Sequence, residues 1–271
     1  MSAMKQIICI KWGTKFGPEY VNRLHAMIAR NITPPFRLIC FTDDGAGLHP
    51  DIAVRPLPRF DYTAPVNTLG KWPKSRLWGD LGDVTGTVLF LDLDVVITGN
   101  LDDFFTFGAP GDTVLATNPK SVKPFEKLGQ TSVYRMQVGK LAPLQEIFRA
   151  DPQGIADEYR FEQRFVTRRA PGGVTFWPKG WVVHFRKHCV PPVPLRYWQA
   201  PTIPKGAKIV IFAGSLNPPD AIAGRWSEDD THRPPADHLR AAFDGRRRES
   251  LSRHLRHYIL PTPWVADLWR E

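Results

Sequence analysis

Apolar runs and helix-like spacing alternate over the first 120 residues of the chain. The run Lys5–Ile10 predicts a buried strand, the apolar spacing within Pro18–Arg30 predicts a helix, and Phe36–Phe41 predicts a second strand. Further along, Thr87–Asp94 predicts a strand that ends in two carboxylates. Strands that alternate with helices favour an α/β fold with a mostly parallel sheet covered by helices on both faces.

The pattern after residue 130 is mixed, and prolines interrupt it often. Asn100 and Asp103 are typical of the start of a helix, and Pro235–Tyr258 predicts one or two helices rich in Arg and His. We divide the chain into a domain of residues 1–225 and a basic helical appendage of residues 226–271. The other expected elements are helices over Pro73–Trp78, Leu101–Phe105, Leu141–Arg149 and Asp157–Val166, and strands over Ser132–Val138, Gly172–Trp177 and Lys208–Phe212.

Composition narrows the class of protein. With 271 residues, 42% of them hydrophobic, the chain is long enough for a proper core, and no stretch reaches the about 18 apolar residues of a membrane span. The first residues lack a cleavage site for a signal peptide, so we expect a soluble, cytoplasmic protein. Cys9, Cys40 and Cys189 lack CxxC spacing, which favours buried thiols. The net charge of +9 favours phosphate-bearing partners.

The sequence Phe90-Leu-Asp92-Leu-Asp94 carries the strongest chemical signal. Ligands gather at the carboxyl ends of strands in open α/β sheets, and alternate strand residues point the same way, so both carboxylates can face one site. Two such oxygen ligands can hold Mg²⁺ or Mn²⁺ against a diphosphate, and the metal then acts as a Lewis acid. The alternative is a solvated strand end that precedes a turn.

Two enzyme chemistries use a pair of this kind. In haloacid-dehalogenase-like phosphatases the first Asp is a phosphorylated nucleophile, whereas in glycosyltransferases of the GT-A fold both residues serve the metal and the nucleotide. The phosphatase pair usually ends the first strand of its domain, but here at least two strands precede it. These phosphatases usually have a small or hydroxyl residue two positions after the second Asp, but this chain has Val96 there. These features favour the glycosyltransferase.

The chain resembles bacterial glycosyltransferases related to family 8. The resemblance implies a GT-A fold, a nucleotide-sugar donor such as a UDP-sugar, a divalent cation, and hexosyl transfer with retention of configuration. It covers about residues 5–225, in the order Ile10-Lys-Trp-Gly-Thr, Tyr20-Val-Asn-Arg-Leu, Phe41-Thr-Asp-Asp, Phe90-Leu-Asp-Leu-Asp-Val-Val, Leu101-Asp-Asp-Phe, Thr131-Ser-Val-Tyr-Arg, Phe161-Glu-Gln, Trp177-Pro-Lys-Gly-Trp and Phe212-Ala-Gly-Ser-Leu-Asn-Pro-Pro.

The resemblance also implies roles for single residues. Asp92 and Asp94 would bind Mn²⁺ or Mg²⁺ together with the donor diphosphate and ribose. Glu162 and Gln163 take the place of an Asp-Gln pair near the transferred sugar, and a solvated helix face is the alternative. For Lys74 the alternative to a phosphate contact is an exposed lysine. The nucleotide-sugar contacts that it implies are Lys11, Trp12, Gly13, Thr14, Tyr20, Asp43, Asp44, Lys74, Gly214 and Asn217.

One departure from the pattern concerns the metal. Relatives carry a late histidine as a third ligand, but the corresponding position here is Ala213, which cannot ligate. Either His184 or His188 substitutes, or metal binding is weakened, or the protein binds a nucleotide sugar without catalysing transfer. A structural role for each histidine is the alternative.

Positive charge is concentrated near the C-terminus. An amphipathic helix there would suit peripheral contact with the anionic inner face of a membrane and a saccharide or lipid-linked acceptor, whereas the alternative is a helix packed on the domain. No motif for nucleic-acid binding accompanies the charge. The basic residues are Arg233, His238, Arg240, Arg246, Arg247, Arg248, Arg253, His254, Arg256 and His257.

Overall fold

A computed structural model of the chain describes residues 4–59, 61–67, 72–119, 126–243 and 249–271. Arg246, Arg247 and Arg248 of the predicted basic helices lie outside this range. The chain forms two compact units. Unit 1 comprises Met1–His25, Ile32–Leu93 and Asn100–Lys179, and unit 2 comprises Ala26–Asn31, Asp94–Gly99 and Gly180–Glu271. The domain boundary predicted after residue 225 lies inside unit 2 and stays a prediction.

Unit 1 is built on a seven-stranded mixed sheet in the order β3-β2-β1-β4-β7-β6-β8. The neighbours β3, β2, β1 and β4 run parallel, whereas β7 is antiparallel to both β4 and β6. The expected α/β fold is therefore confirmed, with an antiparallel part added to the parallel one. The strands are β1 (Lys5–Lys11), β2 (Phe36–Thr42), β3 (Ala53–Pro56), β4 (Thr87–Leu91), β6 (Val114–Thr117), β7 (Gly129–Gln137) and β8 (Thr175–Phe176).

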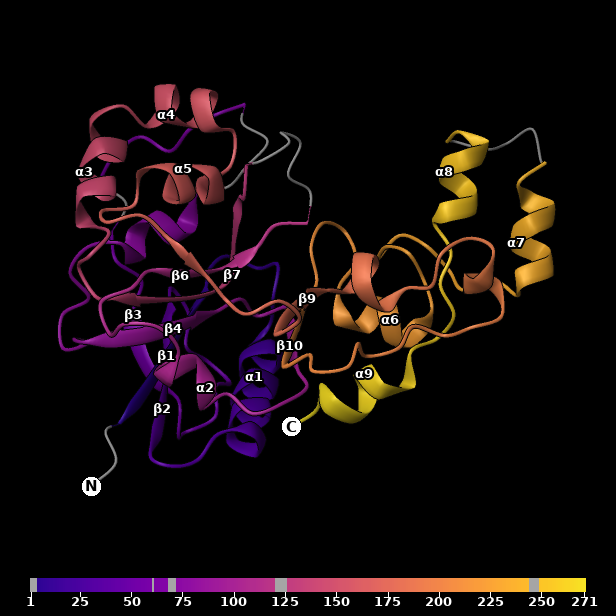
Figure 1. Ribbon diagram of the computed structural model, residues 1–271, viewed down its shortest axis with the longest axis horizontal. Coiled ribbons are helices and arrows are strands. Elements are labelled where there is room, and N and C mark those ends of the chain that lie inside the picture. Colours follow the sequence, from indigo (N-terminus) through magenta and orange to yellow (C-terminus); the bar gives the residue numbers. More distant parts are fainter. Residues whose placement is uncertain (1–3, 60, 68–71, 120–125, 244–248) are drawn as a thin grey trace. The chain divides into compact units, whose positions relative to one another are not determined.

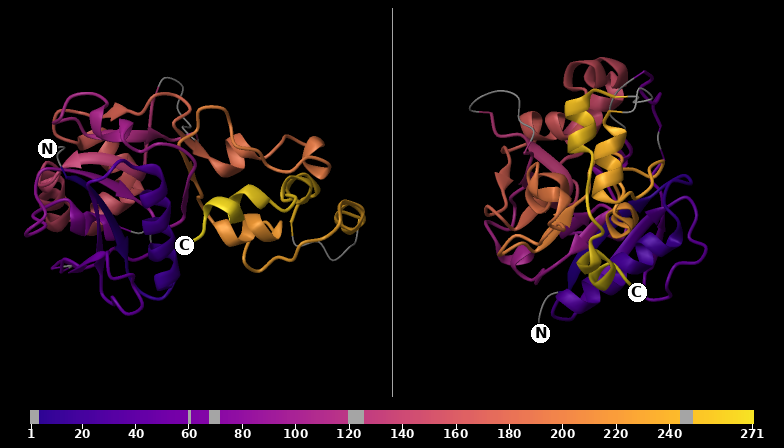
Figure 2. Two further views of the ribbon diagram at one scale, coloured as in Figure 1. Left: turned by 90° about the horizontal axis from the view of Figure 1, so that it is seen from below. Right: turned by 90° about the vertical axis from the view of Figure 1, so that its right-hand side faces the viewer.

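Helices cover this sheet on both faces (Figures 1 and 2), with the first part of α1 (Pro18–Asn31) on one side and α3, α4 and α5 on the other. On the side of α3 to α5, the strand residues Ile8 and Phe90 are fully buried in one apolar cluster with Phe148 of α3. Burying a side chain of this size stabilises the fold by about 1.5–3 kcal/mol. The three helices are α3 (Ala142–Ala150), α4 (Pro152–Tyr159) and α5 (Glu162–Arg169).

Unit 2 contains a three-stranded sheet in the order β5-β10-β9. Strand β10 (Ile209–Ile211) is antiparallel to β5 (Val95–Ile97) and parallel to β9 (Val182–His184). The start of β5 and the ends of β9 and β10 therefore lie at one edge. The helices are α6 (Pro218–Ala223), α7 (Pro235–Ala241), α8 (Leu251–Arg256) and α9 (Pro263–Leu268). Within the described part of the chain, no helix is long and apolar enough to span a membrane.

Three expected elements need correction. The strand predicted over Thr87–Asp94 ends at Leu91, because the chain turns and continues as β5 in the other sheet. The helix predicted over Asp157–Val166 is interrupted, since Arg160 has a positive φ of 63° and separates α4 from α5. The helix predicted over Leu101–Phe105, with Asn100 at its start, is the shorter α2 (Asp103–Thr106), and its N-cap residue is Asp102. Asn100 instead accepts the backbone N–H of Asp102 through Oδ1 at 2.6 Å.

Candidate functional site

A lysine and an aspartate form an ion pair where β4 ends in unit 1. Asp92 directly follows the strand, and its N–H donates to the Ser132 carbonyl on β7 at 2.9 Å. Lys74, from the 3₁₀ helix η1 (Pro73–Leu77), places Nζ 2.8 Å from Asp92 Oδ1 and 2.9 Å from Oδ2. The Lys74 side chain is only 13% exposed, so it is not the exposed lysine that was the alternative to a phosphate contact.

A second carboxyl group joins this pair through Thr131. The Lys74 ammonium also donates to the Thr131 carbonyl at 2.8 Å, and it lies 4.9 Å from the centre of the Phe90 ring. The Thr131 hydroxyl donates to Glu162 Oε1 at 2.8 Å. Glu162 is the first residue of α5, and only 6% of it is exposed, so it does not lie on a solvated helix face. Lys74, Asp92, Thr131 and Glu162 thus form one connected group, which we call the Lys74–Glu162 cluster.

Burial controls the protonation of Glu162 in the Lys74–Glu162 cluster. It raises the pKa of Glu162 to about 7, against the opposing effects of the Lys74 ammonium and the Thr131 hydrogen bond. Burial also raises the pKa of Tyr134, and the carboxylates of Glu162 and Asp92 raise it further. No described residue forms a hydrogen bond with the buried Tyr134 hydroxyl, which packs beside Phe90.

The raised pKa of Glu162 predicts how stability depends on pH. Unfolded Glu162 releases its proton near its ordinary value of 4.5, whereas the folded protein retains it until about pH 7. The contribution of Glu162 to stability is therefore highest below pH 4.5 and falls by about 3 kcal/mol as pH rises to 7. Glu162→Gln keeps an acceptor for Thr131 but cannot ionise. Urea unfolding at pH 5 and pH 7.5 should show this loss in the wild type relative to the variant, and parallel pH profiles would contradict it.

Polar residues at the ends of β1 and β2 form a second group in unit 1. The two strands are parallel, with Lys11 opposite Thr42, so the residues that follow them meet at one edge of the sheet. Lys11 Nζ donates to the Asp44 carbonyl at 3.1 Å, and the Gly13 N–H donates to Asp43 Oδ2 at 3.0 Å. Gly13 has φ of 61°, a conformation that suits glycine. Both aspartates are exposed, so their charge is accessible to a ligand.

The remaining predicted contacts of unit 1 are more dispersed. Trp12 is 41% exposed, and Thr14 is exposed beside it. Tyr20 lies in the first turn of α1, where its ring centre is 4.5 Å from that of Phe16. Gln163 is partly buried next to Glu162 in α5. A stacking role for Tyr20 and a sugar contact for Gln163 stay predictions.

Unit 2 contains Ala213, which occupies the position of the third metal ligand in relatives, and the two histidines that could replace that ligand. The Phe212 N–H donates to the Asp94 carbonyl at 3.3 Å, which places Ala213 at the same sheet edge as Asp94. His184 ends β9 opposite Ile211 and is only 4% exposed. His188 Nδ1 accepts the backbone N–H of His184 at 2.8 Å, so His188 has a structural contact.

Gly214 and Asn217, also in unit 2, have structural surroundings of their own. Gly214 has φ of 91°, and a Cβ there would lie 3.5 Å from Arg186 Nη1. Asn217 is the N-cap residue of α6, and its N–H donates to Asp220 Oδ2 at 2.8 Å. Their contacts with a nucleotide sugar stay predictions.

Sequence reasoning did not single out two residues of the Lys74–Glu162 cluster and its surroundings. Thr131 and Tyr134 lie on β7, within the segment Thr131-Ser-Val-Tyr-Arg, but neither was assigned a role. The signal available was their position on a strand beside β4. Only the antiparallel pairing of β4 with β7, which places Tyr134 opposite Phe90, turns that position into a contact.

Comparison with known proteins identifies the fold. No protein-family model matches the sequence, and no curated protein matches it either. An active-site mutant of LgtC is 12% identical, with 96% of this chain and 98% of that chain covered and a TM-score of 0.55. The galactosyltransferase LgtC with donor and acceptor sugar analogues gives 12% identity, coverage of 97% and 100%, and a TM-score of 0.54. The glycosyltransferase GlyE of Streptococcus pneumoniae TIGR4 is 12% identical, with 98% of this chain and 65% of that chain covered and a TM-score of 0.53. The chain therefore has the GT-A fold of these glycosyltransferases.

Proposed function

We propose that the protein is a glycosyltransferase that moves a hexose from a nucleotide sugar, such as a UDP-sugar, to a saccharide or lipid-linked acceptor with retention of configuration. The observation that carries the proposal is the Lys74–Glu162 cluster at the carboxyl end of β4, in a chain that has the fold of glycosyltransferases. Ligands of open α/β sheets bind at such strand ends. Membership of family 8 is part of this proposal.

The metal ligands that we propose are Asp92 and Asp94. Lys74 contacts both oxygens of Asp92, but an ionised carboxylate offers about four lone-pair sites, so acceptor capacity is left. Hard carboxylate oxygens fit Mg²⁺ or Mn²⁺. When bound, such an ion supplies Lewis acidity toward the leaving diphosphate.

The other residues would bind the donor and orient the acceptor. Lys74 and Lys11 carry positive charge at the ends of β4 and β1, where it favours binding of the diphosphate. Asp43 and Asp44 would accept hydrogen bonds from ribose or uracil. Glu162 and Gln163 would lie near the transferred sugar, and a carboxyl group with a pKa of about 7 can exchange a proton at neutral pH. Holding the acceptor hydroxyl near the anomeric carbon supplies much of the rate.

Calorimetric titration with UDP tests the proposal. We expect binding in the presence of Mn²⁺ that is lost in EDTA, because the carboxylates and the diphosphate then repel each other. Failure of UDP, GDP and CMP to bind in the presence of Mn²⁺ would contradict the proposal. Phosphate release from a monoester in the absence of a sugar donor would instead support a phosphatase that uses Asp92.

Ala213 favours a second candidate, a nucleotide-sugar-binding protein with weakened catalysis. If the missing imidazole limits metal affinity, Ala213→His should tighten Mn²⁺ binding by at least about tenfold, since position 213 follows the residue that bonds Asp94. Ala213→Gln adds a side chain of similar size and serves as the control. Titration with Mn²⁺ measures the difference, and equal affinities for the two variants would contradict it.

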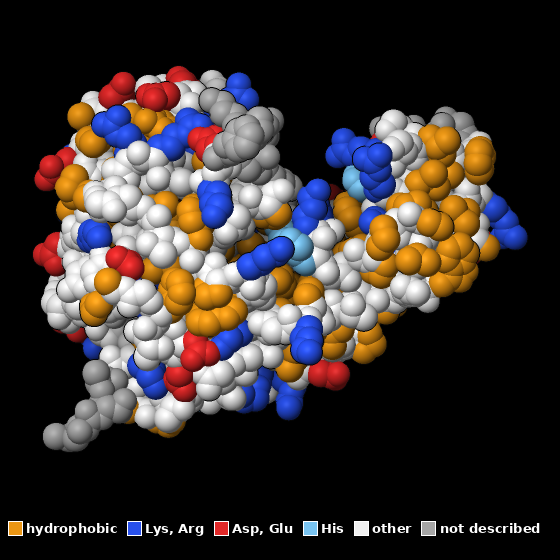
Figure 3. Space-filling view, viewed as in Figure 1, with side chains coloured by type: hydrophobic (Ala, Val, Ile, Leu, Met, Phe, Trp, Pro, Cys, Tyr) orange, Lys and Arg blue, Asp and Glu red, His pale blue; other side chains and the backbone are white. Residues whose placement is uncertain are grey.

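Peripheral contact with an anionic membrane is a further part of the proposal. Unit 2 exposes large apolar side chains, among them Phe243 at 81% and Trp198 at 70%, and Figure 3 shows apolar side chains gathered on the face that carries α7. Arg240 and Arg253 are also exposed. Apolar residues flanked by arginines suit an anionic lipid surface. Sedimentation with phosphatidylglycerol vesicles, but not with phosphatidylcholine vesicles, is expected; no sedimentation with either would contradict it.

A further inference from the structure

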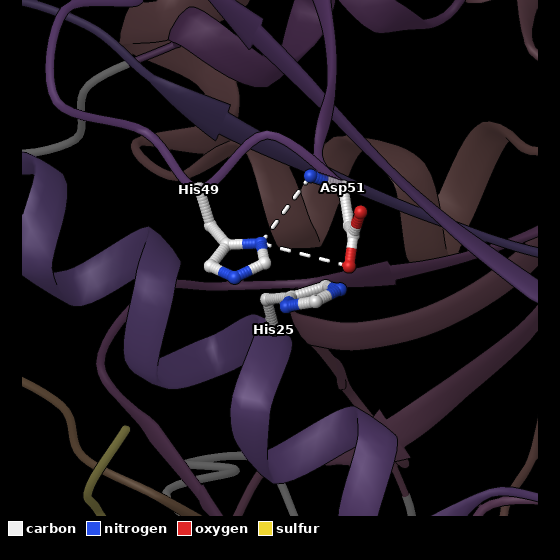
Figure 4. A group of neighbouring side chains, drawn as sticks. All are labelled: His25, His49 and Asp51. Carbon is white, nitrogen blue, oxygen red and sulfur yellow. Dashed lines mark hydrogen bonds and ion pairs between the residues drawn. The ribbon is translucent and has the colours of Figure 1, made fainter.

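Two histidines and an aspartate converge on the surface of unit 1. His25 lies on α1, and His49 and Asp51 lie on the connection between β2 and β3. One ligand atom from each residue lies within 4.8 Å of the others. Figure 4 shows the His25 ring beside the His49 ring, with the Asp51 carboxylate turned toward both. The two ring centres are 5.1 Å apart.

Asn22 holds this arrangement in place. It lies one helical turn before His25, so the two side chains share a face of α1. Its Nδ2 donates to the Gly47 carbonyl at 3.0 Å, and its Oδ1 accepts the N–H of His49 at 2.9 Å. These two bonds attach the backbone on both sides of residue 48 to the helix. His49 is therefore kept beside His25 by contacts that do not involve either imidazole.

The His49 imidazole has a ring nitrogen that can ligate a metal. The Asp51 N–H donates to His49 Nδ1 at 3.2 Å, so this nitrogen carries a lone pair, and it lies 3.8 Å from Asp51 Oδ2. The side chains of His49 and Asp51 are 49% and 74% exposed, so they can rotate and a water molecule can reach the site.

We propose that His25, His49 and Asp51 bind a zinc ion. Two imidazole nitrogens and one carboxylate oxygen form a known type of three-residue zinc site, in which water fills the fourth position. Ligands at about 2.0–2.2 Å from one ion lie somewhat closer together than these atoms do, and rotation of the two exposed side chains closes the difference. The ion would link α1 to the connection that also carries Asp43 and Asp44.

Zinc titration of the full, EDTA-treated and desalted chain tests this site. We expect the wild type to bind one more equivalent of Zn²⁺ than His49→Gln and Asp51→Asn, or to bind it at least about tenfold more tightly. Asp61→Asn, which changes another exposed aspartate of unit 1, is the matched control and should bind zinc like the wild type. Circular dichroism checks that each variant folds.

Thermal unfolding gives a second readout that is independent of activity. Because a ligand that binds only the folded state stabilises it, Zn²⁺ should raise the melting temperature of the wild type and of Asp61→Asn by more than that of His49→Gln. Wild-type zinc affinity in both site variants, or no zinc binding by the wild type, would overturn the assignment. UDP binding does not enter either readout, so failure here leaves the proposed transferase activity standing.

Discussion

Asp92→Asn is expected to abolish Mn²⁺-dependent binding of UDP while the protein stays folded. Asparagine keeps the shape of the side chain but removes the charge that would hold the cation, and removal of such a ligand weakens binding by at least about 100-fold. The fold should persist because the Asp92 side chain is 22% exposed and follows β4 rather than lying inside the core. Calorimetry with UDP and Mn²⁺ measures the effect.

The control for this variant is Asp61→Asn, because Asp61 is an exposed aspartate of the same unit whose partner is Arg149. Exposed ion pairs of this kind contribute about 0–1 kcal/mol, so binding of UDP should not change. If Asp92→Asn bound UDP and Mn²⁺ as the wild type does, the metal would have to be bound elsewhere in the chain.

Lys74→Met is expected to lower the rate of sugar transfer by about 10²–10³, a typical cost of losing one preorganised group that stabilises developing charge. The change removes the cation that lies between Asp92 and the Thr131 carbonyl. It should also raise the pKa of Glu162 above about 7, since Lys74 is the strongest influence that lowers it. Steady-state kinetics measures the first effect, and carbon NMR of labelled glutamate measures the second.

Two further variants serve as controls for Lys74→Met. Lys74→Arg keeps the positive charge and should retain more activity than Lys74→Met. Lys140→Met removes a lysine of unit 1 that contacts the Gly111 carbonyl outside the Lys74–Glu162 cluster, and should leave the rate unchanged. An unaltered rate together with an unaltered Glu162 titration in Lys74→Met would show that the ammonium group has neither role.

Much of the fold of unit 1 could be predicted from the sequence. Lys5–Ile10, Pro18–Arg30 and Phe36–Phe41 have strong patterns, and each corresponds to β1, α1 or β2 within one residue at each end. The strands β3 and β6 were not predicted, because four residues are too few to show a period. They belong to the sheet because β2 and β7 provide hydrogen-bonding edges for them.

The candidate sites could be predicted from the sequence only in part. Asp92 was singled out by its chemistry and spacing and Glu162 by the resemblance to family 8, but the lysine and threonine contacts that connect them depend on how η1, β7 and α5 pack. The spacing His49-x-Asp51 is visible in the sequence, yet nothing in the pattern indicates His25 as a third member. That contact exists because the segment after β2 returns to α1, where Asn22 binds it.

The most direct test of the proposed activity is donor turnover by the purified protein. The chain is incubated with Mn²⁺ and single UDP-hexoses, and release of UDP is followed with and without saccharide acceptors. We expect UDP release from one of these donors that is faster with an acceptor and lost in Asp92→Asn and in EDTA. Binding of UDP-sugars without any release of UDP, under conditions in which the protein is folded, would contradict a transferase and favour a nucleotide-sugar-binding protein.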